Sequence, residues 1–130
     1  MPHVVLAKAA NEDIISILEW SHQNFGEQAR LRYEALLTQA IIDISESPDR
    51  PGCVAREELA TDARTYHLWH SRNRVGKTPG VVSKPRHFLL FRISARGDIE
   101  IGRVLHDSMD LASNLPSDYF GQSSDQGTAE

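Results

Sequence analysis

The sequence predicts a two-layer α+β domain in which a helical hairpin covers one face of a small antiparallel sheet. Apolar residues recur every three or four positions along residues 14–25 and 29–44, which is the spacing of two amphipathic helices. After a connector rich in proline and glycine, three stretches typical of strands follow at 64–70, 87–93 and 99–105. The apolar stripe of the helices and one face of the sheet are expected to bury each other.

The first half of the chain predicts one short strand and the two helices. Residues 3–8 are rich in β-branched side chains and are interpreted as a first or edge strand. Asn11 is expected to cap the first helix, with acidic residues following in its first turn. Gly26 is expected to reverse the chain, and the second helix is expected from Glu27 to Glu46.

The second half predicts the sheet and the end of the domain. Residues 87–93 form the most apolar strand, and Gly97 is expected to occupy a left-handed position in the following hairpin loop. Asp107 is expected to begin a short helix that ends near residue 116. We therefore predict a domain over residues 1–116 and a disordered, polar tail over 117–130.

Composition limits the classes of function. The chain has 130 residues, 40% of them hydrophobic and 25% charged, which predicts one globular domain. No run of apolar residues approaches the length of a membrane span, and no signal peptide is visible. The single cysteine, Cys53, excludes an internal disulfide and a multi-cysteine metal site. We expect a cytoplasmic protein without a metal, a cofactor or a membrane partner.

Positive charge is concentrated in one part of the chain. Residues 64–106 contain nine Lys and Arg against two acidic residues, a net +7, whereas the remainder of the chain carries −11. Arginine binds phosphates and carboxylates through two parallel hydrogen bonds. The candidate target-binding cations are Arg72, Arg86, Arg92 and Arg103. They are expected to project from the sheet face opposite the helices; the alternative is ordinary solvated charge at strand ends.

Alternation along residues 86–93 assigns the faces of the central strand. Leu89 and Phe91 share the predicted core face with His87, which is therefore expected to be a partly buried histidine, while Arg86 and Arg92 lie on the other face. His106 ends the last strand and is a candidate for proton transfer or target contact. If the ends of the first and last of these three strands are neighbours, a small polar site forms there; the alternative is a set of structural hydrogen bonds.

Several strings resemble the toxins of RelE/ParE-type toxin–antitoxin systems. These are RTYHLWHSR (64–72), PRHFLLFR (85–92) and IEIGRVLHDSMDL (99–111), together with the helical pattern A..DI..I..W....FG over residues 10–26. The resemblance covers about residues 3–116 and is closer to the ParE branch than to RelE. It implies the fold predicted above, with the helical hairpin packed on the sheet.

The resemblance also implies a function. ParE-like relatives inhibit DNA gyrase, whereas RelE-like relatives cut messenger RNA in the ribosome with basic residues and a tyrosine or histidine near the C-terminus. For a nuclease, the implied catalytic residues are Arg72, Arg86, Arg103 and His106. No tyrosine follows the last strand until Tyr119, which favours gyrase inhibition. A binding module of the same fold without toxicity is the third alternative.

A toxin of this kind implies a cognate antitoxin as partner. Its expected contact is on the outer helix faces, where Trp20 and Leu31 depart from the core stripe. Assembly into larger toxin–antitoxin complexes is compatible with the resemblance and stays open.

Overall fold

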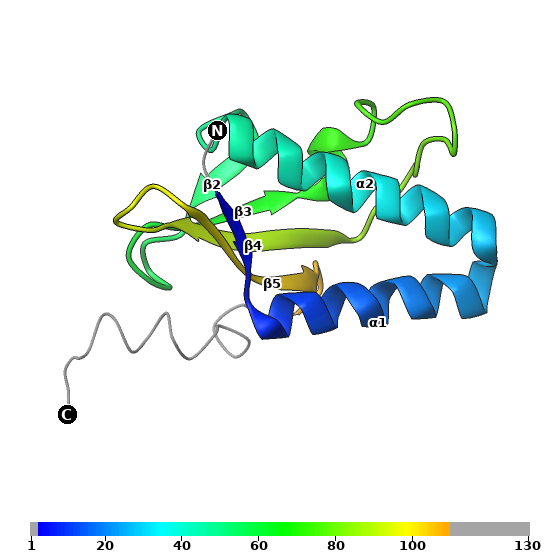
Figure 1. Ribbon diagram of the computed structural model, residues 1–130, viewed down its shortest axis with the longest axis horizontal. Helices are drawn as coiled ribbons and strands as arrows, with labels where there is room; N and C mark the ends of the chain where they lie inside the picture. The colour runs from blue at the N-terminus through cyan, green and yellow to red at the C-terminus, as the bar shows by residue number, and fades with distance from the viewer. Residues whose placement is uncertain (1–2, 110–130) are drawn as a thin grey trace.

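Two helices pack on a five-stranded sheet in the computed structural model of the chain, which describes residues 3–109 (Figure 1). Strand β1 precedes the helical hairpin, and the other four strands follow it. The elements are β1 (Val4–Leu6), α1 (Lys8–Phe25), α2 (Glu27–Glu46), β2 (Cys53–Ala55), β3 (Ala63–His67), the 3-10 turn η1 (Leu68–Ser71), β4 (His87–Ile93) and β5 (Ile99–His106). The predicted two-layer α+β class is confirmed.

The sheet has the strand order β1-β5-β4-β3-β2. Strands β3 to β5 pair in antiparallel fashion as predicted, and β2 adds a further antiparallel strand beside β3. Strand β1 runs parallel to β5, which makes the sheet mixed. Parallel neighbours need a long crossover, and here the helical hairpin and the three intervening strands supply it. The edge strand expected over residues 3–8 is present, but it is shorter and covers Val4–Leu6.

The first helix begins earlier than predicted. Helix α1 starts at Lys8, directly after β1, so Asn11 lies inside its first turn and is not its cap. Ala7 occupies the capping position without a side-chain hydrogen bond, and its amide donates to the Ile101 carbonyl at 2.9 Å. The strand therefore positions the helix start by backbone pairing. The reversal at Gly26, with φ at 91°, and the predicted bounds of α2 are confirmed.

The main core lies between the hairpin and the sheet, and its members are fully or almost fully buried. Leu36, Ala40 and Ile44 from α2 pack with Leu89 and Phe91 from β4. The alternation along β4 therefore assigned its core face correctly. About a dozen buried side chains at roughly 1.5–3 kcal/mol each supply the driving force that holds the two layers together.

The opposite face of the sheet is not fully open, contrary to the prediction. Leu90 on that face is fully buried in a second apolar cluster with Ala60 and Ala63, and Leu59 packs against the cluster. The connector before β3 thus covers part of this face, because the chain turns back over it after β2. Strand β2 itself was not predicted, since three residues are too few for an alternating pattern.

Strand β3 ends three residues before the predicted end at His70. The Nδ1 atom of His67 accepts a hydrogen bond from the Trp69 amide at 3.0 Å, which begins the 3-10 turn. The side chain of His67 thereby replaces the next hydrogen bond of the ladder.

The remaining predictions concern residues near the C-terminus. Asp107–Met109 form a turn in which the Met109 amide donates to the His106 carbonyl at 3.0 Å. The rest of the predicted short helix and the tail 117–130 lie outside the described residues. Within 3–109, no helix combines the length and the apolar character that crossing a membrane requires.

Candidate functional site at the histidine end of the sheet

Two of the predicted target-binding arginines, the buried Arg92 and the partly exposed Arg103, are bound to carboxylates of the protein itself. Arg92 is 6% exposed, and its Nε donates to Glu100 Oε1 at 2.7 Å. Arg103 donates from Nε to Asp13 Oδ2 at 2.7 Å. A buried guanidinium is stable only with a carboxylate partner. The prediction that these two cations project together toward a target is therefore corrected.

The other two arginines lie near the ends of strands, with partners of their own. Arg86 binds Asp107, with Nη2 to Oδ1 at 2.9 Å, yet its side chain remains 60% exposed. The Arg72 guanidinium lies 3.6 Å from the centroid of the Trp69 ring, which is a cation–π contact. The four arginines thus do not form one convergent face, and two of them remain at the surface near one end of the sheet.

Three histidines meet at this end, each on a different strand. His87 at the start of β4 faces His106 at the end of β5, with ring centroids 5.3 Å apart. His67 at the end of β3 reaches across to Asp107, with Nε2 and Oδ2 at 3.1 Å. We call His67, Arg86, His87, His106 and Asp107 the histidine end. The His67–Asp107 contact thus brings the ends of β3 and β5 together, which is the condition that the sequence set for a polar site here and also the kind of hydrogen bond that its structural alternative named.

The electrostatics of the histidine end are set by one exposed ion pair. Hydrogen bonds from Arg86 and His67 hold the pKa of Asp107 at about 2, so this carboxylate is charged at neutral pH. His106 is partly exposed, and its Nδ1 lies 2.8 Å from Ser108 Oγ. The arrangement can bind an anion or transfer a proton at His106. No cluster of three or more candidate metal ligands occurs in residues 3–109.

Helix α2 supplies a residue of this site that the sequence did not reveal. The Tyr33 hydroxyl lies 2.7 Å from His87 Nδ1 and accepts the Arg86 amide at 3.2 Å. Because the phenol oxygen accepts that amide, its own proton is available to donate to Nδ1. Burial raises the pKa of Tyr33 to about 12 and lowers the pKa of His87 to about 4. Tyr33 follows the apolar spacing of α2, so nothing local marked it as a site residue.

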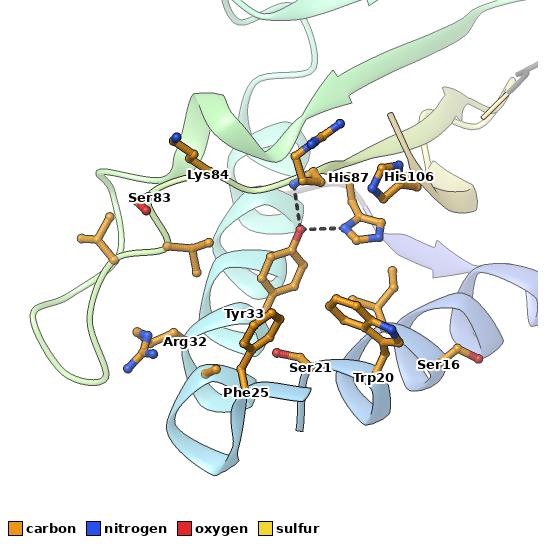
Figure 2. Close-up of a pocket in the computed structure, with 15 residues that line it drawn as sticks. Ser16, Trp20, Ser21, Phe25, Arg32, Tyr33, Ser83, Lys84, His87 and His106 are labelled. Carbon is orange, nitrogen blue, oxygen red and sulfur yellow. Dashed lines mark hydrogen bonds between the residues drawn. The ribbon is translucent and has the colours of Figure 1, made fainter. Parts of the chain in front are cut away.

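A cavity of about 790 Å³ opens beside the histidine end, between the helical hairpin and residues 81–84. We call it the aromatic pocket because Trp20, Phe25 and Tyr33 line it (Figure 2). Trp20 is 58% exposed, as its departure from the core stripe predicted. Leu31 is partly buried and does not line the pocket.

Comparison with protein families identifies the chain. Residues 4–111 match the model of the ParE toxin of type II toxin–antitoxin systems, parDE. The chain belongs to this ParE toxin family. The match spans both helices and all five strands of the described fold. No curated protein sequence matches the chain significantly.

A solved structure supports the same fold for this ParE family member. A chain from the chromosomal ParDE toxin–antitoxin system of P. aeruginosa superposes with a TM-score of 0.57 at 13% sequence identity. The match covers 82% of this chain and 96% of that one. Identity this low supports the fold alone, whereas the family match implies an antitoxin partner.

Proposed function

We propose that this ParE-family chain is the toxin of a type II toxin–antitoxin pair, that it inhibits DNA gyrase, and that a cognate antitoxin neutralises it. The observation that carries this proposal is the family match over residues 4–111, which takes in the whole described fold. Inhibition needs no bond-making by the toxin, only a surface that holds the target. We place the activity in the cytoplasm, where gyrase acts on DNA.

We assign target contact to three residues of the predicted set that reach the surface: Arg86, which is exposed, and His106 and Arg72, which are partly exposed. Arg86 offers an exposed guanidinium whose partner Asp107 is also near the surface, so a target carboxylate or phosphate can compete for it. Arg92 and Arg103 are instead assigned to holding the fold, because each is bound to a carboxylate of its own domain.

For the antitoxin, we propose contact with the outer face of the hairpin at Trp20 and Leu31. Trp20 supports this assignment because large exposed aromatic residues are the commonest anchors of protein interfaces. Leu31 contributes less surface, since it is already partly buried.

The test is a supercoiling assay with purified gyrase, relaxed plasmid and the full chain. The wild type is expected to block supercoiling and to trap cleaved plasmid. Arg86→Ala and His106→Ala are expected to weaken inhibition by about tenfold each, the usual effect of removing a central contact. Arg96→Ala is the matched control, because Arg96 lies in the exposed β4–β5 turn at the other end of the sheet.

A ribosome-dependent endoribonuclease is the second candidate, and the histidine end favours it specifically. His106 could accept or donate a proton, while Arg86 could hold the phosphate. In a translation reaction, this function predicts messenger RNA cut at codon boundaries and no cutting by His106→Ala. Such cleavage, with gyrase fully active at excess toxin, would overturn the gyrase proposal.

A further inference from the structure

The aromatic pocket presents large apolar side chains to solvent. Trp20 and Phe25 are 58% and 68% exposed and touch edge to face, with centroids 5.5 Å apart. Val81, which is 48% exposed, lines the same cavity from the loop before β4. A contiguous group of this kind marks a surface that another segment covers. Its volume of about 790 Å³ can take two large side chains.

The rim of this pocket is cationic. Arg32 and Lys84 (Figure 2), together with Arg86, line it, and no Asp or Glu is among its lining residues. Arg86 already binds Asp107, but Arg32 and Lys84 form no ion pair with any residue of the described range 3–109. The pocket therefore fits an acidic segment that carries an aromatic anchor.

The chain itself contains a segment with this chemistry after the described residues. Residues 110–130 hold four acidic residues and no Lys or Arg, and they include the adjacent pair Tyr119 and Phe120. Residues 1–109 contain 14 acidic and 14 basic residues, so the final 21 residues account for the entire net charge of −4.

We propose that the aromatic pocket is the docking site of the chain's own C-terminal segment, with Tyr119 and Phe120 as anchors and its carboxylates beside Arg32 and Lys84. The connection is long enough for Tyr119 to reach the pocket. Met109 is hydrogen-bonded to His106, which lines the pocket, and the ten residues from there to Tyr119 span up to about 34 Å when extended.

Covalent attachment strengthens a contact that is weak between separate molecules. Attachment through about ten residues gives an effective concentration of about 1 mM, so a site with a dissociation constant near that value is about half occupied. The docked segment covers Trp20, and any partner that binds there must displace it. This inference does not depend on gyrase being the target.

The test uses the full chain with Trp69→Phe, so that Trp20 is the only tryptophan. Acrylamide quenching of the Trp20 fluorescence is measured in this chain and in the same chain that also carries Tyr119→Ser and Phe120→Ser. At half occupancy, the quenching constant is expected to rise about twofold when the anchors are removed. Ser123→Ala/Ser124→Ala is the matched control in the same segment and is expected to leave quenching unchanged. Equal quenching in all three chains would overturn the proposal.

Charge reversal separates the docking from an indirect effect on the fold. Arg32→Glu/Lys84→Glu is expected to raise quenching to the level of the anchor variant, and adding Asp118→Lys/Asp125→Lys is expected to restore protection. Failure of the second pair to restore protection, with circular dichroism unchanged, argues against the charge contact and overturns the proposal. Protection must also be independent of protein concentration from about 1 to about 100 µM, well below the effective concentration of the attached segment. Protection that grows with concentration would assign the pocket to a second copy instead.

Discussion

The carboxylate of Asp13 on α1 binds the guanidinium of Arg103 on β5 through two hydrogen bonds, Nε to Oδ2 at 2.7 Å and Nη2 to Oδ1 at 3.0 Å. The same carboxylate accepts the Val104 amide at 2.9 Å. Asp13 therefore joins the first helix to the last strand at three points. The hydrogen bond with Asp13 also raises the pKa of the Arg103 guanidinium above its usual range, so this guanidinium stays charged.

Arg103→Ala is expected to lower the free energy of unfolding by about 2 kcal/mol, because it leaves the partly buried carboxylate of Asp13 without its cation. Urea unfolding of the wild type, Arg103→Ala, Asp13→Ala and the double variant gives the coupling energy between the two side chains. This coupling energy is expected to be at least about 1 kcal/mol. Toxicity is expected to fall only in proportion to the folded fraction. Unchanged stability with lost gyrase inhibition would instead make Arg103 a direct target contact.

The Asp13–Arg103 pair shows why the charge pattern of the sequence gave a wrong prediction for the orientation of Arg103. Counting charges along residues 64–106 revealed the local excess of arginine, but Asp13 lies 90 positions away from Arg103. A pairing of that kind depends on how α1 crosses β5, which no local spacing encodes. Arg92 pairs with Glu100 across the β4–β5 hairpin, where register and the bulge at Leu90 and Phe91 decide which side chains meet.

The fold itself was more predictable, because it depends on local apolar spacing. The spacing predicted α2 to the residue and the core face of β4 through Leu89 and Phe91. It missed the start of α1, which is positioned by pairing of Ala7 with β5. The site was predicted only as a meeting of strand ends, since Tyr33 reaches His87 from a different layer.

The burial of His87 predicts a loss of stability in mild acid. Its folded pKa of about 4 lies below the ordinary value of 6.5, chiefly through burial and secondly through His106. The unfolded chain therefore binds more protons between pH 6.5 and 4, and stability falls as pH falls through this window. From pH 7.5 to 5, the loss is expected to be about 2 kcal/mol.

His87→Asn is the variant that checks this expectation, because it removes the titrating ring while keeping a polar group near Tyr33. Urea unfolding at several pH values is expected to show a flatter dependence than in the wild type. A wild type equally stable at pH 7.5 and pH 5 would show that His87 takes up its proton without cost. Tyr33→Phe removes only the hydroxyl group, and it is expected to cost about 1 kcal/mol at neutral pH.

The fully buried Asp43 predicts a large effect from a single substitution. Its carboxylate accepts hydrogen bonds from Ser71 at 2.6 Å, Arg74 at 2.9 Å and Gln39 at 2.9 Å, which outweigh the effect of burial and lower its pKa. Asp43→Ala is expected to cost about 3–5 kcal/mol, because it leaves cations and hydroxyls unpaired around the end of α2.

Asp49→Ala is the matched control for Asp43→Ala. Asp49 also pairs with an arginine, Arg64 at 2.7 Å, but its side chain is 86% exposed. Removing an exposed partner is expected to cost less than about 1 kcal/mol. Comparable losses for the two variants in urea unfolding would contradict the view that the Asp43 network holds α2 against η1.

Alanine substitutions at two glycines with positive φ are expected to distinguish the cost of backbone strain from the cost of side-chain crowding. Gly52 has φ at 104°, and a Cβ atom there would lie 2.7 Å from the Cγ and Cδ2 atoms of His70. Gly97 has φ at 90°, with no atom within 4 Å of such a Cβ. Gly97→Ala is expected to cost about 1 kcal/mol from strain alone, and Gly52→Ala about 1–3 kcal/mol more, because the His70 ring must move from its contacts with Tyr66 and Trp69.

The excess cost of Gly52→Ala is expected to disappear when His70 is already alanine. The free energy of urea unfolding is compared for His70→Ala and the double variant His70→Ala/Gly52→Ala. The difference between them should be no larger than the loss caused by Gly97→Ala in the wild type, because only the backbone strain remains. If the cost is the same with and without the imidazole, crowding by His70 is not its cause. The close approach of His70 to the Gly52 backbone would then have no part in holding the turn before β2 against η1.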